Sequence, residues 1–486
     1  MPTPLYADLE QNRKALNKMF GQSTDFYAKP IRIRGVPCLV CMFDGLSSTE
    51  KLWVILLDRV SRAALPARDG ASLFEWMMEE TDLPLEPDPA KDFETVSAKL
   101  TGGLAVLLAD GCSQALLLSN QSMQGRSVAE PSGEGDIRGS REGFCDLLRV
   151  NVSLLRRLDR AEGLVIELFQ LDTHTRTEAA LCYDRDLAPP ELVAEARRRL
   201  KASRLPLVLD SSYLAPDLQR GQGCFFSQVG YTERSATACA KLCEGKVVVL
   251  VNGSPFALIL PYFFCEHFQS LDDYAQKAYF ASFVRGLKYL AFWLAALLPG
   301  LYVCVAKFMP EVFPRQLLVR IAAAESATPW PLFLEMVLVI LLLEIVREAG
   351  LRLPKPIGHS VSLVSALIIG DAAVGAGILS TPVVIVAALT SLAVFVLPSM
   401  YEPLTILRIL FVLAAGLCGP LGVAALLVWM LTSICGAESF GLPHAAPFSP
   451  WQRGAVRDGL MRWPWPVLVD HPFTVRAVKR GGGHHR

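Results

Sequence analysis

The apolar segments between about Tyr289 and Cys435 constrain this chain most, because they follow one another too densely for the core of an ordinary soluble protein. The first of them, residues 289–306, carries no charge and is bounded by Lys288 and Lys307. An apolar helix needs about 20 residues to cross a bilayer, and aromatic residues favour the two ends of such a helix. Residues 289–306 therefore predict a membrane-spanning helix.

Four more apolar segments follow, and together they predict an α-helical multi-pass transmembrane domain over residues 287–441. The segments are residues 331–347, 357–380, 382–397 and 404–435. Gly419 and Pro420 fall inside the last segment, and glycine and proline mark positions where helices break. That segment is therefore either a re-entrant hairpin or one long tilted span.

Charged residues are dense before about Lys288, and this part predicts an α/β cytoplasmic region of two subdomains. The first subdomain is expected over residues 1–126 and the second over residues 144–286, with the polar stretch 127–143 as a hinge or linker. Arg138, Arg141 and Glu142 in this linker could bind an anion. Arginine and glutamate beside a hinge are expected instead to fix the two subdomains by ion pairs.

Apolar periodicity and turn residues predict the elements of both subdomains. Helices are predicted at residues 9–20, 48–62, 144–158, 190–201 and 232–244. Strands are predicted as a pair within 31–44 turning at Gly35, as a hairpin around Gly111 at the centre of the first subdomain, at 164–170, 178–184 and 205–210, and as a hairpin turning at Asn252 and Gly253.

The distribution of basic residues predicts which parts face the cytoplasm. The N-terminus lacks the apolar stretch of a cleavable signal peptide, so the first region is expected on the cytoplasmic side. Basic residues favour that side, and they gather after the second apolar segment and in the tail, residues 442–486: Arg347, Arg352, Lys355, Arg453, Arg457, Arg462, Lys479 and Arg480. A cytoplasmic tail favours an even number of crossings.

No motif for catalysis is found, because the chain has no GxxxxGK[ST] phosphate loop, no GxSxG elbow and no HExxH sequence. Cys38 and Cys41 form a CxxC motif, but in a strand these side chains point to opposite faces. The 47 Lys and Arg residues balance the 47 Asp and Glu residues, so no net field attracts nucleic acid. We expect no enzyme activity, no cofactor, no metal site and no nucleic-acid partner.

Carboxylates within the apolar segments are the first candidates for a functional site, because ionisable groups at membrane depth are costly. Glu335 and Glu344 are nine residues apart, about half a turn out of phase on a helix, so they cannot line the same wall. Arg347 can pair with Glu344 one turn away. A neutralised ion pair is therefore the alternative to a role in a pore.

The segment 357–380 is the second candidate, because it combines hydroxyl and carboxylate groups with glycines. On a continuous helix Asp371 lies on nearly the same face as Ser360, eleven residues earlier. Their oxygen atoms could replace part of the water around a cation, and Ser362 and Ser365 are further candidates for pore lining or gating. Close helix packing by small residues is the alternative.

Several phrases of the sequence occur in the order found in one known family. They are RGSREGF from Arg138, LDSSY from Leu209, GYTERS from Gly230, GKVVVLVNGSPFALILP from Gly245, KYLAFWLAALLPGLYV from Lys288, RIAAAES from Arg320 and EIVREAGLRLPKPIGHSVSLVSALIIGDAAVGAGILS from Glu344. The chain thereby resembles the GerA family of spore germination proteins, the A-subunit type of germinant receptors. The resemblance is collinear over residues 138–441 and weakens over residues 1–126.

The resemblance implies a multi-pass protein of the spore inner membrane. It also implies two partners, a membrane subunit that recognises nutrients and a lipoprotein subunit, and a homo-oligomer that conducts monovalent cations. The expected function is to convert nutrient binding by these partners into cation release during germination. The alternatives are a GerA-like accessory channel linked to dipicolinic acid release, a transporter, or a membrane-anchored scaffold without conduction.

Overall fold

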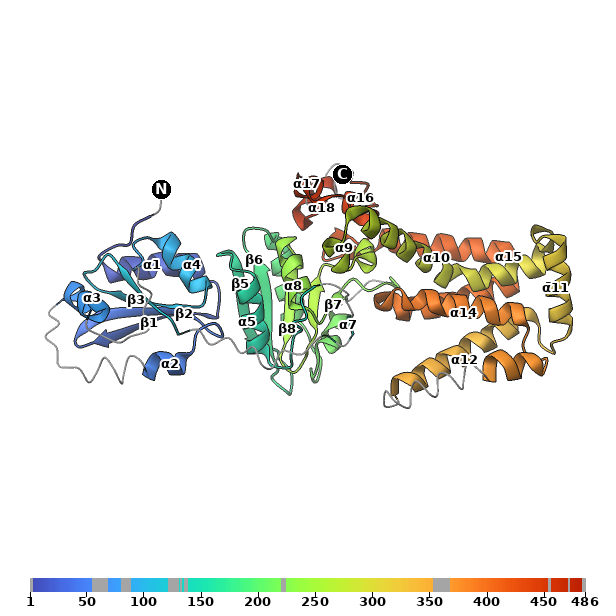
Figure 1. The fold of residues 1–486 in the computed structure, drawn as a ribbon, viewed down its shortest axis with the longest axis horizontal. Coiled ribbons are helices and arrows are strands. Elements are labelled where there is room, and N and C mark those ends of the chain that lie inside the picture. The colour runs from blue at the N-terminus through green and yellow to red at the C-terminus, as the bar shows by residue number, and fades with distance from the viewer. Residues whose placement is uncertain are drawn as a thin grey trace.

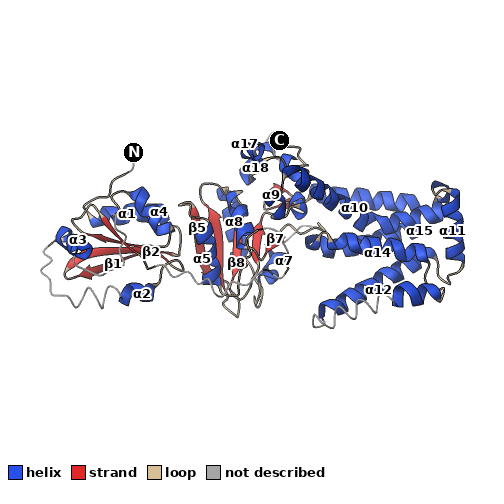
Figure 2. Cartoon of the chain, viewed as in Figure 1, coloured by secondary structure: helices blue, strands red, loops and turns tan. Residues whose placement is uncertain are grey.

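The computed structural model describes residues 3–54, 69–79, 89–120, 131, 133–134, 139–219, 224–352, 368–452, 456–470 and 473–482. The molecule is elongated, with two sheet-containing parts followed by a helical part (Figure 1). The strands that the structure describes lie in the first two parts and in a short pair after the helices (Figure 2). This order agrees with the predicted α/β region followed by a helical region.

The first sheet is an antiparallel meander in the order β1-β2-β3-β4. Its strands are Phe26–Ile33, Val36–Phe43, Ala105–Ala109 and Ala115–Leu118. The predicted turn at Gly35 is confirmed, and this glycine has a φ of 87°. The hairpin around Gly111 also forms, but β4 lies at the edge of the sheet and not at its centre.

Neighbouring side chains of a strand point to opposite faces, so the apolar strands of the first sheet have two apolar faces. Helices cover both of these faces. Cys38 faces one apolar cluster and Cys41 the other, as the sequence predicted. One face is covered by α1 (Leu9–Phe20) and α4 (Phe93–Thr101), and the other by α2 (Thr49–Val54) and α3 (Gly70–Glu79).

The second sheet is antiparallel in the order β5-β6-β8-β9-β7. Its strands are Leu164–Gln170, Glu178–Asp184, Gly230–Thr232, Val247–Val251 and Ala257–Leu260, from β5 to β9 in chain order. One face is covered by α5 (Leu148–Leu158) and α8 (Ser235–Cys243), and the other by α6 (Pro190–Lys201), α7 (Leu214–Leu218) and the end of the chain.

Two expectations for the second sheet were wrong in detail. Residues 205–210 are irregular and not a strand; Pro206 has no N–H to donate to a ladder, and the Val208 carbonyl accepts a hydrogen bond from Thr177 Oγ1 at 2.6 Å. The β8–β9 hairpin forms, but residues 252–256 make a longer loop than the predicted two-residue turn. Strand β7 was not predicted.

A buried arginine joins the two sheets. Arg156 of α5 donates from Nε to Asp25 Oδ2 at 2.8 Å and from Nη2 to Ser23 Oγ at 2.6 Å. Of the residues predicted to fix the hinge, Glu142 pairs with Arg157 of α5 and Arg141 is exposed, while Arg138 lies outside the described residues. Helix α5 therefore contacts the first subdomain together with strand β5, where the Ile166 carbonyl accepts a hydrogen bond from the Thr24 N–H at 2.8 Å.

Among the described residues of the helical part, two stretches are long and apolar enough to cross a membrane, α10 and residues 398–436. The next apolar helix in length, α14, is shorter, and α12 carries charges along its length. The bounds are α10 Ala278–Phe308, α11 Arg315–Ser326, α12 Leu332–Arg352, the π-helical turn Ile368–Ala373, α14 Thr381–Phe395 and α15 Tyr401–Gly436.

Helix α15 is a hairpin folded at Gly419, whose φ of 60° and ψ of −141° are not helical. A Cβ at Gly422 would stand 2.5 Å from the carbonyl oxygen of Ala414, eight residues earlier, although eight residues of a straight helix rise about 12 Å. The second arm returns to the sheet, because the Trp429 and Phe225 rings lie 5.2 Å apart. The structure therefore shows a hairpin in this segment and not the single long helix that the sequence also allowed.

The residues after α15 pack back onto the second sheet. Phe473, Val475 and Val478 are buried in the same apolar cluster as β6 and β8. The elements of this tail are β10 Glu438–Ser439, β11 Leu442–Pro443, α16 Val456–Gly459, α17 Trp465–Asp470 and α18 Val475–Gly482. The sequence predicted a tail on the same side as the sheets but gave no sign of this packing.

Candidate functional site

Glu335 in the first turn of α12 is fully buried. One of its carboxylate oxygens accepts a hydrogen bond from the backbone N–H of Ser380, at the start of α14. The other oxygen has no hydrogen-bond partner within the part of the chain that the structure describes. Burying a carboxylate with an unsatisfied oxygen costs several kcal/mol, typically about 3–5 for a buried charge that lacks its partner. This residue is therefore a strong candidate for binding a proton or a cation.

Other oxygen atoms surround Glu335. Tyr302 of α10 and Glu325 of α11 both lie within electrostatic range of its carboxylate. The Ser380 hydroxyl is also buried without a hydrogen-bond partner among the described residues, and the Tyr302 hydroxyl interacts with the Glu325 carboxylate. Burial raises the pKa of the Glu325 carboxyl, and the neighbouring Glu335 raises it further. Oxygen ligands of this kind suit a hard cation.

Glu344 faces a different helix and is neutralised. Its Oε2 accepts a hydrogen bond from Arg347 Nε at 3.0 Å, as the sequence predicted, and another from the Tyr401 hydroxyl. Its Oε1 pairs with Arg408 of α15, whose side chain is 2% exposed. Glu335 and Glu344 therefore face different partners, in agreement with the predicted phase difference along α12.

Arg408 was not among the residues to which the sequence pointed. It is the one charged residue in the apolar segment 404–435. An arginine in such a segment requires a partner, because a charge at membrane depth is costly unless it is paired. That rule could have predicted an acidic partner for Arg408, but not that the partner is Glu344, 64 residues earlier in the sequence.

The structure describes only the C-terminal part of segment 357–380, in which hydroxyl and carboxylate groups were predicted to share one helix face. Asp371 is exposed and lies in the π-helical turn Ile368–Ala373. Ser360, Ser362 and Ser365 lie outside the described residues. Pore lining by this segment therefore stays a prediction.

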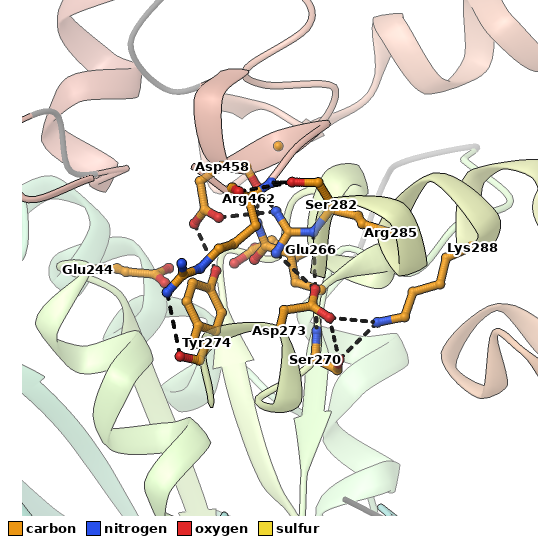
Figure 3. A network of polar contacts seen from close by, with 12 residues as sticks. Glu244, Glu266, Ser270, Asp273, Tyr274, Ser282, Arg285, Lys288, Asp458 and Arg462 are labelled. Carbon is orange, nitrogen blue, oxygen red and sulfur yellow. Dashed lines mark hydrogen bonds and ion pairs between the residues drawn. The ribbon is translucent and has the colours of Figure 1, made fainter. Parts of the chain in front are cut away.

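A second polar cluster connects the helical part to the second sheet and the tail. Arg285 of α10 is fully buried and donates to Asp273 Oδ2 from Nη2 at 2.9 Å. It also pairs with Asp458 of the tail, from Nη1 to Oδ1 at 3.1 Å. Figure 3 shows Arg285 between these two carboxylates, with Lys288 on the outer side of Asp273. One side chain thus ties α10 to α9 (Asp272–Ala275) and to α16.

Further buried charged residues lie between this polar cluster and the second sheet. Glu266, in the 3₁₀ turn Phe264–Phe268, accepts hydrogen bonds from Lys241 Nζ at 2.6 Å and from Lys246 Nζ. Burial alone would raise the pKa of Glu266, but the two lysines outweigh burial and hold that pKa at about 2. Tyr274 donates from its hydroxyl to Asp458 at 2.7 Å. The junction is therefore a connected set of ion pairs.

His267 provides a separate contact between the sheet and the helices. Its Nδ1 lies 3.1 Å from Ser399 Oγ, just before α15, and its Nε2 lies 3.2 Å from the Ser227 carbonyl oxygen. Burial, with a smaller contribution from His444, lowers the pKa of His267 to about 4. The imidazole is therefore neutral near pH 7.

The fold and these contacts define a class of protein: an α/β region with two antiparallel sheets, coupled through buried ion pairs to a helical region that holds two candidate membrane spans. A comparison with family models assigns the family. The model for the Bacillus/Clostridium GerA spore germination protein matches residues 14–474, so the chain belongs to the GerA family, as the quoted phrases indicated.

The chain is also similar in sequence to two spore germination proteins and to an uncharacterized membrane protein. Spore germination protein KA of Bacillus subtilis (strain 168) is 32% identical, with 98% of this chain and 88% of that protein covered. Spore germination protein B1 of the same organism is 32% identical, with 96% and 97% covered. The uncharacterized membrane protein YfkQ, also from this organism, is 36% identical, with 80% and 75% covered.

Among solved structures, the crystal structure of the N-terminal domain of the A subunit of the Bacillus megaterium spore germinant receptor GerK3 is similar to part of the chain. It is 21% identical, covers 54% of this chain and 98% of that chain, and gives a TM-score of 0.43.

Proposed function

We propose that this chain is a membrane subunit of a spore germinant receptor, which converts nutrient binding by partner subunits into release of monovalent cations. Membership of the GerA family supports a role in spore germination. The observation that carries the conduction step is Glu335, a fully buried carboxylate whose second oxygen lacks a protein partner in the described part of the chain. A transient cation or proton at this oxygen would offset the cost of burying the charge.

The proposed route of coupling runs through Arg285. Partner subunits that contact the sheets would bias the position of α9 and α16, and both of these elements are paired to α10 by this arginine. Because α10 also carries Tyr302 beside Glu335, a shift of α10 changes the surroundings of the buried carboxylate. The proposal is a population shift between two packings of the helices.

The arrangement of the chain supports a multi-pass topology with both soluble parts on the cytoplasmic side of the spore inner membrane. The second sheet precedes α10, and the tail that follows α15 packs on that same sheet. Each arm of the α15 hairpin is about 26 Å long, close to the about 30 Å of a bilayer core. Exposed apolar side chains on α14 and α15, such as Leu392 and Leu421, would face lipid or further copies of the chain.

The test is to replace Glu335 by Gln and, separately, by Ala in spores, and to record K⁺ and Na⁺ release after nutrient addition. We expect the rate of release to change roughly tenfold or more, because coupling energies of about 1–3 kcal/mol are lost with the charge. Glu311→Gln is the matched control, since Glu311 is an exposed carboxylate in the turn that follows α10.

Two outcomes would overturn this function. Wild-type rates in both Glu335 variants, at wild-type protein levels, would remove this carboxylate from conduction. The second outcome is that vesicles reconstituted with the intact protein and its partner subunits never conduct cations. That result would favour a scaffold, one of the alternatives raised by the sequence.

A further inference from the structure

The C-terminal ends of two neighbouring helices bring together three groups that bind metals. Asp159 is the C-cap of α5, and Cys239 and Cys243 lie in the last two turns of α8. Both helices pack on the same face of the second sheet, where Figure 1 shows them side by side. One ligand atom of each residue lies within 4.8 Å of the other two.

The two sulfurs are placed for shared coordination and not for a disulfide. Residues four apart on a helix project from one face, and both cysteines are free thiols. A disulfide requires Cβ atoms about 3.5–4.5 Å apart, whereas residues four apart on a helix have Cβ atoms about 5–6 Å apart.

The surroundings of the three groups attract a cation. The C-terminal end of a helix carries about half a negative charge, and here two such ends meet. Asp184 and Glu244 lie within electrostatic range of Cys243 and add negative potential. Arg156 is the nearby positive charge, but its guanidinium is already engaged with Asp25 and Ser23. Asp159 is 9% exposed and uses Oδ1 to accept from the Ala161 N–H at 3.0 Å.

We infer that Asp159, Cys239 and Cys243 form a binding site for a divalent cation of the zinc type. Two thiolates and a carboxylate match the ligand preference of zinc, with Zn–S distances of about 2.3 Å and Zn–O distances of about 2.0–2.2 Å. A tetrahedral set requires sulfurs about 3.8 Å apart, which small side-chain rotations can reach from the observed spacing. Cys243 is exposed, so water can take the fourth position. Binding releases the two thiol protons to solvent.

This site would fasten the end of α5 to the end of α8. Arg156, which joins the two sheets, lies one turn before Asp159 on α5. A bound cation would therefore hold the helix that carries the contact between the subdomains. This role is separate from cation release through the helical part, so either inference can fail without the other.

The test measures zinc and cobalt binding to the full chain in detergent. His484 and His485 are replaced by alanine in every variant, because adjacent histidines near the terminus also bind zinc. We expect one tightly bound Zn²⁺ per chain, release of protons on binding, and a thiolate-to-metal charge-transfer band with Co²⁺. Cys239→Ser, Cys243→Ser and Asp159→Asn should each weaken zinc binding by roughly 100-fold or more.

Cys145→Ser is the matched control, because Cys145 is a partly exposed free thiol of the same subdomain outside the cluster. It should leave zinc affinity and the cobalt band unchanged. A second measurement guards against misfolded variants: zinc should raise the thermal unfolding midpoint of the wild type and of Cys145→Ser, but not of Cys243→Ser. Zinc affinity that is equal in the wild type and in a Cys239→Ser, Cys243→Ser double variant would overturn the inference.

Discussion

At the scale of single residues, the joint between the two sheets depends on Arg156. Its guanidinium is fully buried, pairs with Asp25 and lies 4.5 Å from the centre of the Phe43 ring. A second ion pair, between Arg149 and Asp44 at 2.7 Å, also connects the subdomains, but its arginine side chain is 69% exposed. The two ion pairs connect the same subdomains but differ in burial, so we expect them to contribute differently to stability.

Replacing Arg156 by Ala should destabilise the protein by about 3–5 kcal/mol, because Asp25 would be left buried without its partner. Arg149→Ala should cost less than about 1 kcal/mol, because water screens an exposed pair. Denaturant unfolding followed by tryptophan fluorescence, with protease cleavage as a second probe, measures both. Equal effects of the two substitutions would contradict this assignment.

His267 gives a second prediction at this scale. Its folded-state pKa of about 4 lies below the ordinary value of 6.5, so the unfolded chain binds more protons between these pH values. Stability should therefore be complete above about pH 6.5 and should fall as the pH drops towards 4, by about 3 kcal/mol for this residue. His444 has a similarly lowered pKa and contributes in the same direction.

The measurement is the thermal unfolding midpoint between pH 7 and pH 4. His267→Gln should make this pH dependence shallower, because glutamine keeps a polar side chain near Ser399 and does not titrate. His174→Gln, at an exposed loop position, should leave the pH dependence as in the wild type. An unchanged slope in His267→Gln would show that the histidine does not control the acid response.

At the scale of elements, the fold of α15 depends on one glycine. A Cβ at Gly419 would meet the Phe308 ring at 3.1 Å, and its φ of 60° is unfavourable for other residues. At Gly286 in α10, a Cβ would meet no atom within 4 Å. The two glycines therefore offer a direct comparison within the helical part.

Gly419→Ala should lower stability by about 1–2 kcal/mol, since the new side chain is strained in this backbone conformation and crowds Phe308. Gly286→Ala should be neutral or stabilising by up to about 1 kcal/mol, because alanine is the better helix former. Thermal unfolding in detergent distinguishes the two variants. A stable Gly419→Ala protein would argue for a continuous helix in place of the hairpin.

The elements that the sequence predicted well are those with a clear local period. Helices Leu9–Phe20 and Pro190–Lys201 and strands Leu164–Gln170 and Glu178–Asp184 agree with the predicted ranges. Residues 205–210 were misread, because their apolar side chains resemble a strand although Leu207 and Leu209 are largely exposed. Local periodicity does not report whether a neighbouring strand is present to complete the ladder.

The sequence singled out Glu335 and Glu344 because each is a charge within an apolar segment, and their role in a pore stays a prediction. The pairings of the other buried charges were not predictable, because the partners come from distant parts of the sequence. Asp25 and Arg156 are 131 residues apart, and Arg285 and Asp458 are 173 apart. Without a rule for long-range pairing, residues of the right charge cannot be matched from one sequence.

At the scale of the whole molecule, the proposed topology predicts where two cysteines lie. Cys418 immediately precedes the tip of the α15 hairpin, whereas Cys435 lies at the end of its second arm, near the second sheet. Both are exposed. If α15 spans the bilayer, they lie on opposite sides of it.

Single-cysteine variants in inside-out vesicles, treated with a membrane-impermeant maleimide, test this topology. Cys435 should react, as should Cys243 on the sheet side, and Cys418 should react only when the opposite face is accessible. Reaction of Cys418 and Cys435 from the same face would exclude a spanning hairpin and would place α15 along the membrane surface.

The fold-back at Gly419 also bears on how the protein is made. When both arms of a hairpin cross a bilayer, the chain before the hairpin and the chain after it lie on the same side of the membrane. If α15 spans the bilayer as proposed, residues 437–482 need no translocation through the lipid before they dock on the second sheet. In that topology, the two sheets and the tail can assemble in a single compartment as soon as synthesis ends.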